Sequence, residues 1–536
     1  MRERLKLDQA DHSIPETIGD HTYYIKSLPR LNFPLYCRQH VKTAKEEVLL
    51  NPNDMDDFGQ IGVFKVSPDG QFLAYTMDPR GDELYDAYVK DLRTSRTIKL
   101  QQHARSIEWD TVGSLYYTVP DAMHRPSRVF RYRHNSGSLP DTLVFEEHNP
   151  SVYVDVVLTK DNRYVLINAN SKRSSEVHTL DAADAAAVPQ LLRPRDPDVL
   201  YFADHATDAF YIVTNDNHVR ICHLEVLKED AAVNFNAAQF TCRRVYVDHA
   251  AGMPLERRTD DASTVSVPMT LVHHKDLVLD GCNPTLLVGY GAYGINLETG
   301  FDMESLSLLE RGWVLAYAHV RGGGELGLDW HTQGRCLLKK NSFVDFAACC
   351  RHLAKSGITT PSLLAAKGTS AGGLLVGCAF FRCVRALVMN VPFLDIAATM
   401  QDPSLPLTVH EYDEWGNPSA DAAVREYIES YSPIDNLRPL SAQSSKDYPA
   451  MFVTTALNDM RVNFWEPLRW VRHFRQNRTN PSKDGAPVVL WCKVSDDGGH
   501  FNGLGRLDQL QAAADEVVFL HHALQLPVER AKSLLI

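Results

Sequence analysis

The sequence predicts a two-domain protein, in which an N-terminal β-propeller is followed by an α/β domain with a doubly wound, mostly parallel sheet. Two observations support this division. Strand-like runs broken by Asp, Asn and Gly turns recur about every 40 to 50 residues up to about residue 255. Beyond that point, short buried-strand runs alternate with helix-like segments, beginning with the apolar run at 285–290.

The N-terminal repeat consists of five hairpin-like units. Each unit has an aspartate in a turn, followed by an alternating or aromatic-rich strand. The five turn aspartates are Asp20, Asp69, Asp110, Asp161 and Asp208. Paired strands with this period are typical of propeller blades, whereas the uneven intervals leave an irregular β-sandwich as the alternative.

The boundary between the domains is placed where the pattern changes. The repeat fades over residues 225–240, and strand-like sequence resumes at Arg243. We place the boundary near Gly252, which assigns residues 1–252 to the propeller and residues 253–536 to the α/β domain.

The charge balance argues against several classes of partner. Lys plus Arg number 55 and Asp plus Glu number 67, which gives a net charge of 55 − 67 = −12. An acidic chain disfavours nucleic acid and anionic membrane surfaces and mildly favours cationic ligands. No run approaches the ~20 apolar residues of a membrane span, and the charged start lacks the apolar core of a signal peptide. We therefore expect a cytoplasmic protein without a nucleic-acid or membrane partner.

No motif indicates a metal or an organic cofactor. The ten cysteines contain no C-x-x-C pair, and no His/Cys/Asp cluster has the spacing of metal ligands. The glycine-rich stretch at 322–327 lacks a G-x-G-x-x-G pattern followed by a helix, so we interpret it as a structural loop.

Residues 368–372 fit the G-x-S-x-G pattern, with Ser370 at the centre. In an α/β-hydrolase this pattern forms a strained strand-to-helix turn that raises the serine oxygen above the sheet. The pentapeptide alone would also fit an ordinary glycine turn. A short apolar run precedes it, however, and a helix-like run at 371–381 follows it. This order favours an α/β-hydrolase with Ser370 as the candidate nucleophile.

A serine hydroxyl attacks a carbonyl only when a neighbouring base takes its proton and a carboxylate orients that base. In an α/β-hydrolase the acid and then the histidine follow the serine along the chain. Asp459 follows the apolar strand at 449–455, and His500 follows the strand at 488–494. Because parallel strands share their carboxyl edge, we expect both residues beside Ser370. Three other carboxylates could take the orienting role: Asp435, Asp496 and Asp497.

Longer motifs cover most of residues 285–506 and are more specific than the pentapeptide. They are YGAYG (290–294), AHVRGGGELG (318–327), KKNSFVDF (339–346), GTSAGG (368–373), VPFLDIAATMQDPSLPLT (391–408), EYDEWGNP (411–418), YSPIDNL (431–437), NDMRVNFWEP (458–467) and GGHFNGLGR (498–506). Looser matches in the N-terminal half are FPLYCR (33–38), SPDGQFLAY (67–75) and VKDL (89–92). With these motifs the chain resembles the prolyl oligopeptidase family of serine peptidases, and within it oligopeptidase B and the prolyl endopeptidase-like proteins.

The resemblance implies a C-terminal α/β-hydrolase domain and a seven-bladed propeller. Only five repeat units are visible, and the stretch from Asp20 to residue 255 is short for seven blades of ~40 to 45 residues. The missing length would lie near residues 224–234. We therefore expect a propeller that looks incomplete. Either it has five blades, or it lacks two blades and the helical segment that precedes the propeller in the family.

Carried over position by position, the resemblance implies that Ser370 is the nucleophile, His500 the general base and acid, and Asp459 the carboxylate that orients it. It also implies an oxyanion hole formed by the hydroxyl of Tyr290 and the backbone N–H of Ala371. Donors aimed at a developing oxyanion are worth ~3 to 4 kcal/mol each. From the sequence alone, Tyr290 would be interpreted as a core aromatic residue at a strand end.

The resemblance further implies that Glu411 and Asp413 form an acidic pair that holds the cationic side chain before the cleaved bond. A solvated charge run is the alternative, because EYDE is acidic throughout. Glu298 falls at the first position of a second acidic pair and Gly300 at the other, which leaves a preference for paired basic residues open. Arg461 resembles an arginine that binds a substrate backbone carbonyl, and a structural ion pair is its alternative.

These features predict a cytoplasmic serine oligopeptidase that cuts short basic peptides after Arg or Lys through an acyl-enzyme on Ser370. Two alternatives stay open. An esterase on the same fold is less favoured, because the EYDE stretch suits a cation better than an acyl chain. A propeller-hydrolase interaction protein with impaired catalysis would retain the motifs without closing its domains. The sequence leaves the oligomeric state open.

Overall fold

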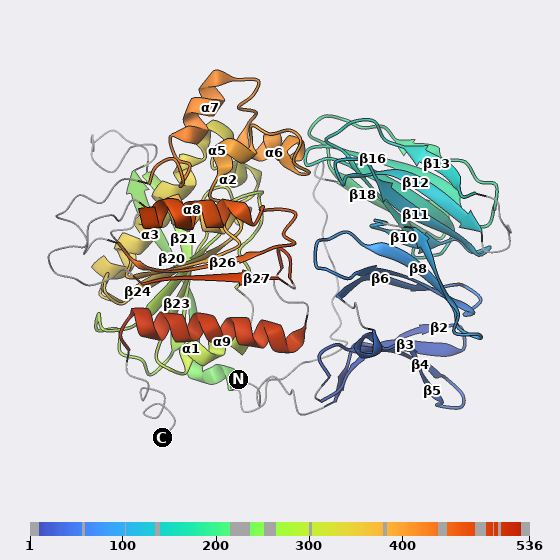
Figure 1. The fold of residues 1–536 in the computed structure, drawn as a ribbon, viewed down its shortest axis with the longest axis horizontal. Helices are drawn as coiled ribbons and strands as arrows, with labels where there is room; N and C mark the ends of the chain where they lie inside the picture. Colours follow the sequence, from blue (N-terminus) through green and yellow to red (C-terminus); the bar gives the residue numbers. More distant parts are fainter. Residues whose placement is uncertain are drawn as a thin grey trace. The chain divides into compact units, whose positions relative to one another are not determined.

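A computed structural model describes residues 10–29, 31–55, 59–101, 103–133, 140–214, 236–250, 264–299, 303–378, 383–437, 448–476, 489–496, 498–501 and 505–526. The chain divides into two compact units (Figure 1). The propeller unit comprises Gln9–Asp230 and Pro403–His410, and the α/β unit comprises the rest of the chain.

The propeller unit is a series of antiparallel sheets. Its described residues contain five sheets, with five, four, four, four and two strands. The first two sheets contain β1 (Asp11–His12), β2 (Glu16–Ile18), β3 (His21–Ser27), β4 (Leu35–His40), β5 (Glu46–Leu50), β6 (Gln60–Val66), β7 (Phe72–Asp78), β8 (Asp86–Asp91) and β9 (Thr97–Gln101). The other three contain β10 (Ile107–Trp109), β11 (Ser114–Pro120), β12 (Pro126–Arg133), β13 (Thr142–Glu146), β14 (Tyr153–Leu158), β15 (Tyr164–Asn170), β16 (Ser175–Asp181), β17 (Gln190–Arg193), β18 (Tyr201–Ala206) and β19 (Ala209–Thr214). A short 3-10 helix, η1 (Pro52–Asp54), follows β5.

Each predicted repeat unit corresponds to one of these sheets. The five turn aspartates lie in the hairpins that lead into β3, β7, β11, β15 and β19. Aspartate suits these turns because its side chain accepts backbone N–H groups a few residues further on. Asp69 Oδ1 accepts the N–H of Gln71 at 3.0 Å, and Asp110 Oδ1 accepts that of Ser114 at 2.7 Å. The predicted period is therefore confirmed.

Apolar cores lie between neighbouring sheets of the propeller unit. Separate clusters join the first sheet to the second, the second to the third, the third to the fourth and the fourth to the fifth. Tyr36 of β4, for example, stacks on Phe64 of β6 with ring centroids 4.9 Å apart. This serial packing is that of propeller blades and differs from two large facing sheets. Residues 224–234, where the missing length was predicted, lie outside the described residues.

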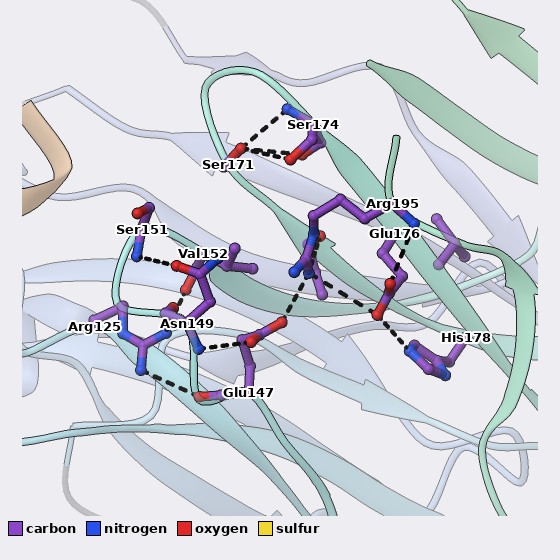
Figure 2. A network of polar contacts seen from close by, with 12 residues as sticks. Arg125, Glu147, Asn149, Ser151, Val152, Ser171, Ser174, Glu176, His178 and Arg195 are labelled. Carbon is purple, nitrogen blue, oxygen red and sulfur yellow. Dashed lines mark hydrogen bonds and ion pairs between the residues drawn. The ribbon is translucent and has the colours of Figure 1, made fainter. Parts of the chain in front are cut away.

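A polar network also joins the third and fourth sheets (Figure 2). Arg125, in the turn between β11 and β12, donates Nη1 to the carbonyl oxygens of Asn149 and Val152, the second at 2.7 Å. Its Nη2 donates to the carbonyl oxygen of Glu147 at 3.2 Å. The carboxylate of Glu147 in turn forms a 2.8 Å ion pair with Arg195, which follows β17. These charge-assisted bonds replace the water that the buried Arg125 has lost.

The α/β unit is built on one eight-stranded sheet with the order β20-β21-β23-β22-β24-β25-β26-β27. The strands are β20 (Phe240–Ala250), β21 (Thr264–His274), β22 (Thr285–Gly289), β23 (Val314–Ala318), β24 (Leu364–Thr369), β25 (Ala386–Asn390), β26 (Ala450–Ala456) and β27 (Leu490–Ser495). β20 and β21 run antiparallel, and β22 to β27 are parallel to one another. The carboxyl ends of six neighbouring strands therefore lie at one edge, where loops can bring functional side chains together.

Helices cover both faces of this sheet, as predicted for a doubly wound domain (Figure 1). One face packs on side chains from α3, α4 and α8, and the other on side chains from α1 and α9. The helices are α1 (Met303–Leu309), α2 (Leu328–Thr332), α3 (Lys340–Lys355), α4 (Ala371–Cys378), α5 (Ile396–Thr399), α6 (Thr408–Trp415), α7 (Ala422–Glu429), α8 (Trp465–Gln476) and α9 (Arg506–Ala523), with the 3-10 helices η2 (Ala237–Gln239) and η3 (Cys336–Leu338). None of the described helices combines the length and apolar character needed to cross a membrane.

The predicted domain boundary lies close to the edge strand of the α/β sheet. The predicted boundary at Gly252 lies outside the described residues, but β20, which precedes it, is the edge strand of the eight-stranded sheet. All eleven residues of β20 pair with β21, from Phe240 opposite His274 to Ala250 opposite Thr264. This long pairing holds β20 in the α/β sheet.

Candidate active site

Ser370 lies on a strained turn between β24 and α4. Its φ of +56° is left-handed, a conformation that side-chain-bearing residues rarely adopt. The glycines on either side are required by close packing. A Cβ on Gly368 would lie 1.9 Å from the carbonyl oxygen of Gly372, and one on Gly372 would lie 2.6 Å from that of Gly289. The predicted strand, turn and helix are therefore all present, with the serine at the carboxyl edge of the sheet.

The backbone of Ser370 is fixed from several directions. Its N–H donates to the carbonyl oxygen of Asn390 at 2.9 Å, which ties the turn to β25. Its carbonyl oxygen accepts the N–H of Gly373 at 2.8 Å and that of Phe393 at 3.1 Å. These bonds hold the strained conformation in place and leave the side chain half-buried.

Asp459 and His500 form a buried pair at the same edge. Asp459 follows β26 and His500 follows β27. The Nδ1 atom of His500 lies 2.8 Å from Oδ2 and 3.0 Å from Oδ1 of Asp459. The N–H groups of Arg461 and Val462 both donate to Asp459 Oδ1 at 2.9 Å, which fixes the carboxylate. Of the competing acids, Asp497 lies outside the described residues, and Asp459 is the acid hydrogen-bonded to the ring.

This pairing determines which ring nitrogen can act as a base. A carboxylate at Nδ1 favours the tautomer that carries the proton on Nδ1. Nε2 then keeps its lone pair. The side chains of His500 and Asp459 are 6% and 0% exposed, so little water competes with the bond between them.

Tyr290 packs on the helix that Ala371 begins. Tyr290 directly follows β22, the neighbour of β24, and Ala371 is the first residue of α4. A Cβ built on Gly372 would lie 3.3 Å from Cα and Cδ2 of Tyr290, so the tyrosine packs on the first turn of the helix. Burial, together with the charges of Glu411 and Glu414, raises the pKa of Tyr290 to about 12. The hydroxyl therefore stays protonated at neutral pH and can donate a hydrogen bond.

The two acidic residues predicted for the substrate cation are placed differently. Both lie on α6. Glu411 faces the loop after β22, because the hydroxyl of Tyr293 on that loop donates to it. Within α6, the indole Nε1 of Trp415 donates to Glu411 Oε2 at 3.1 Å. Asp413 is two residues further on, which is about 200° around a helix. Its backbone carbonyl accepts from Arg335 and Cys336. The structure therefore brings Glu411 to the loop that bears Tyr290, and the role of Asp413 stays a prediction.

The other two predicted substrate residues lie on the surface. Arg461 is exposed, and its guanidinium sits over the ring of Phe501 with 4.9 Å to the centroid. Its positive charge acts against the rise in the pKa of Tyr290. Glu298 is exposed on the loop after β22, and Gly300 lies outside the described residues.

Two buried charges at this site were missed by the sequence analysis. Glu414 and Lys339 are each 2% exposed on their side chains, and their charged atoms lie 3.7 Å apart. Both belong to motifs quoted above, EYDEWGNP and KKNSFVDF. An acidic or basic run normally indicates solvated residues, so only their position inside these motifs could have drawn attention to them. Among the described residues, no three His, Cys, Asp or Glu side chains gather as metal ligands would.

The β24–α4 turn of the parallel sheet carries a strained serine. A buried Asp–His pair lies two and three strands further along the same sheet. This arrangement defines an α/β-hydrolase, here joined to a propeller. Family models divide the chain in the same way. The model of the prolyl oligopeptidase family matches residues 299–526, and that of the prolyl oligopeptidase N-terminal β-propeller domain matches residues 2–229. The chain belongs to the prolyl oligopeptidase family and is a serine-type peptidase.

Individual relatives agree with this placement. Protease 2 of Moraxella lacunata is 28% identical over 96% of this chain and 88% of its own. Dipeptidyl aminopeptidase BI of Pseudoxanthomonas mexicana is 29% identical over 96% and 86%. Among solved structures, oligopeptidase B from Leishmania major is similar with a TM-score of 0.84 and 25% identity, over 96% of this chain and 87% of that one. Oligopeptidase B from Trypanosoma brucei with covalently bound antipain has a TM-score of 0.83 and 25% identity, over 97% and 88%.

Proposed function

We propose that this serine oligopeptidase cleaves short peptides after Arg or Lys, with Ser370, His500 and Asp459 as its catalytic triad. The observation that carries the basic preference is the placement of Glu411, a carboxylate directed at the loop that bears Tyr290. The similarity to oligopeptidase B supports it.

In the proposed reaction, the Oγ of Ser370 attacks the carbonyl carbon of the scissile bond while Nε2 of His500 takes the hydroxyl proton. The negative charge on the carbonyl oxygen is stabilised by the hydroxyl of Tyr290 and the backbone N–H of Ala371. The amine leaves with the proton from His500, and an acyl-enzyme remains. A water then attacks the acyl carbon while His500 takes its proton, and His500 passes that proton to the Oγ of Ser370 as the ester bond breaks and the acid leaves. Asp459 holds the ring and stabilises its protonated form.

The substrate cation would bind at Glu411. A carboxylate held by the indole of Trp415 and the hydroxyl of Tyr293 is already oriented, so it loses little freedom when a guanidinium or ammonium binds. Charge-assisted bonds then favour Arg and Lys over neutral residues. Arg461 remains our proposal for a substrate backbone carbonyl, and Glu298 for a more distant residue of the peptide.

The test is a matched series of chromogenic amide peptides that differ only in the residue before the cleaved bond. We expect turnover with Arg and Lys and much weaker turnover with Ala and Glu. Equal turnover of the Ala and Arg peptides would contradict the proposed preference. Turnover of an uncharged acyl ester without any amide cleavage would favour an esterase. The domain division near residue 252 and the cytoplasmic location stay predictions.

A further inference from the structure

The loop after β22 is held at two backbone points by buried charges. The Nζ atom of Lys339 donates to the carbonyl oxygen of Gly291 at 2.5 Å. The Oε1 atom of Glu414 accepts the N–H of Tyr293 at 3.0 Å. Both loop residues have left-handed backbone, with φ of +68° at Gly291 and +60° at Tyr293. Tyrosine adopts this conformation only under external constraint, so the two polar contacts fix a shape that the loop would not take by itself.

Each of the two charges is compensated inside the protein. The ammonium of Lys339 lies 3.7 Å from Oε1 of Glu414 and 4.8 Å from the ring centroid of Trp415. Oε2 of Glu414 is 2.8 Å from Nε2 of His331. Burial acts to raise the pKa of Glu414, but His331, Lys339 and the Tyr293 amide outweigh it and leave the pKa lowered. Glu414 is therefore ionised and can hold its partners throughout the neutral range.

A buried ion pair is poor support for stability, because apolar residues of similar volume often serve as well. The position of this pair favours a different role. Gly291 follows Tyr290 directly, so the bond from Lys339 fixes the backbone next to the proposed oxyanion donor. Glu414 lies on α6, three residues after Glu411. Helix α6 therefore carries both Glu411, the proposed cation site, and Glu414. We call Glu414 and Lys339, which hold the loop bearing Tyr290, the clamp.

Tyr293 completes the connection between the two. Its N–H binds Glu414, and its hydroxyl donates to Glu411 and accepts from the indole Nε1 of Trp415 at 3.2 Å. The loop that bears Tyr290 is therefore attached to α6 through both the backbone and the side chain of Tyr293.

We propose that Glu414, together with Lys339, is a positioning residue that holds the loop bearing Tyr290 so that its hydroxyl is aimed at the developing oxyanion. This inference rests on the role of Tyr290 in the proposed function. A misplacement of about 1 Å can cost about 100-fold in rate, so a backbone clamp next to the donor can matter as much as a direct contact.

Two variants of the clamp are compared with loss of the hydroxyl itself, Tyr290→Phe. Glu414→Gln keeps the shape of the side chain and removes its charge. The pair Lys339→Met with Glu414→Leu removes both charges of the ion pair at similar volume. Each is measured alone and combined with Tyr290→Phe, with kcat and KM on the Arg amide peptide and the melting temperature. The matched control is Lys65→Met with Glu108→Leu, an ion pair of 2.8 Å in the propeller unit.

We expect Tyr290→Phe to lower kcat about 100-fold. Glu414→Gln should lower it about fivefold, and the Lys339→Met, Glu414→Leu variant at least tenfold, with KM within about twofold of wild type. Because the clamp acts through Tyr290, adding either variant to Tyr290→Phe should cost less than about threefold more. The control should keep wild-type kcat.

Two results would overturn the positioning role and leave the proposed mechanism intact. One is wild-type kcat in both clamp variants. The other is a combined variant whose loss in kcat equals the product of the losses in the clamp variant and in Tyr290→Phe. If Tyr290→Phe alone keeps wild-type kcat, the oxyanion assignment fails and the positioning role fails with it. If the Lys339→Met, Glu414→Leu variant does not fold, kcat of Glu414→Gln, alone and combined with Tyr290→Phe, decides by the same criteria.

Discussion

His500 Nδ1 lies 2.8 Å from Asp459 Oδ2, and the side chain of Asp459 is fully buried. The two residues are 41 positions apart in the chain, and the parallel pairing of β26 with β27 brings them together. Two backbone N–H groups hold the carboxylate that orients the ring. The geometry therefore predicts what removing the charge of Asp459 should do.

Asp459→Asn should lower kcat about 10⁴-fold while the protein stays folded. The amide keeps the size of the side chain and can donate to Nδ1, which would favour the tautomer with its proton on Nε2. That tautomer cannot accept the proton of Ser370. Steady-state kinetics on the Arg peptide, with a melting curve as the folding control, measure the effect. A loss below about tenfold would remove Asp459 from the proposed triad.

Glu411→Gln should reduce the preference for Arg over Ala by about 10- to 100-fold in kcat/KM, the value of a charge-assisted bond. Asp413→Asn is the matched control, because it lies on the same helix but on a different side. We expect it to change the ratio by less than about threefold. A larger effect at Asp413 than at Glu411 would show that the cation binds on the other side of α6.

The free energy of unfolding should decrease as pH rises, because Glu466 loses its proton. This residue of α8 is buried, and burial raises its pKa to about 8, although Thr399 Oγ1 donates to it at 2.7 Å. The charges of Asp395 and Asp459 also act to raise it. Unfolding releases the carboxyl to its ordinary pKa of about 4.3, so the unfolded state binds fewer protons between these values and stability decreases as pH rises.

Glu466→Gln removes this titration. We expect the variant to melt a few degrees above wild type at pH 9 and close to it at pH 5, where the carboxyl is protonated in the folded state. The melting temperature measured across this range provides the test. Parallel curves for the two proteins would contradict a raised pKa at Glu466.

The positions of Ser370, Asp459 and His500 at one edge of the sheet were predictable because strand order and strand ends can be recognised from local sequence. A run of apolar residues followed by a polar loop places Ser370, Asp459 and His500 at one edge of a parallel sheet whatever the details of packing. The propeller repeat was recognisable for a similar reason, since turn aspartates such as Asp69 bind their own turn.

Features that depend on long-range packing were not predictable in this way. Glu411 and Asp413 were paired through the family resemblance, and only the structure shows that both lie on α6, about 200° apart around the helix axis. Glu414 and Lys339 carry charges that usually face solvent, and only the fold around them shows that they are buried. Likewise, β20 joins the α/β sheet through its partner β21, and a strand's own sequence does not say which sheet it will enter.

Whether Ser370 is the nucleophile is tested by treating the folded protein with a fluorophosphonate, measuring its intact mass and mapping the modified peptide. We expect one covalent adduct on Ser370, no adduct in Ser370→Ala, and loss of Arg-peptide cleavage in parallel with labelling. Cleavage that persists in Ser370→Ala, or a folded wild-type protein that labels elsewhere or not at all, would contradict it.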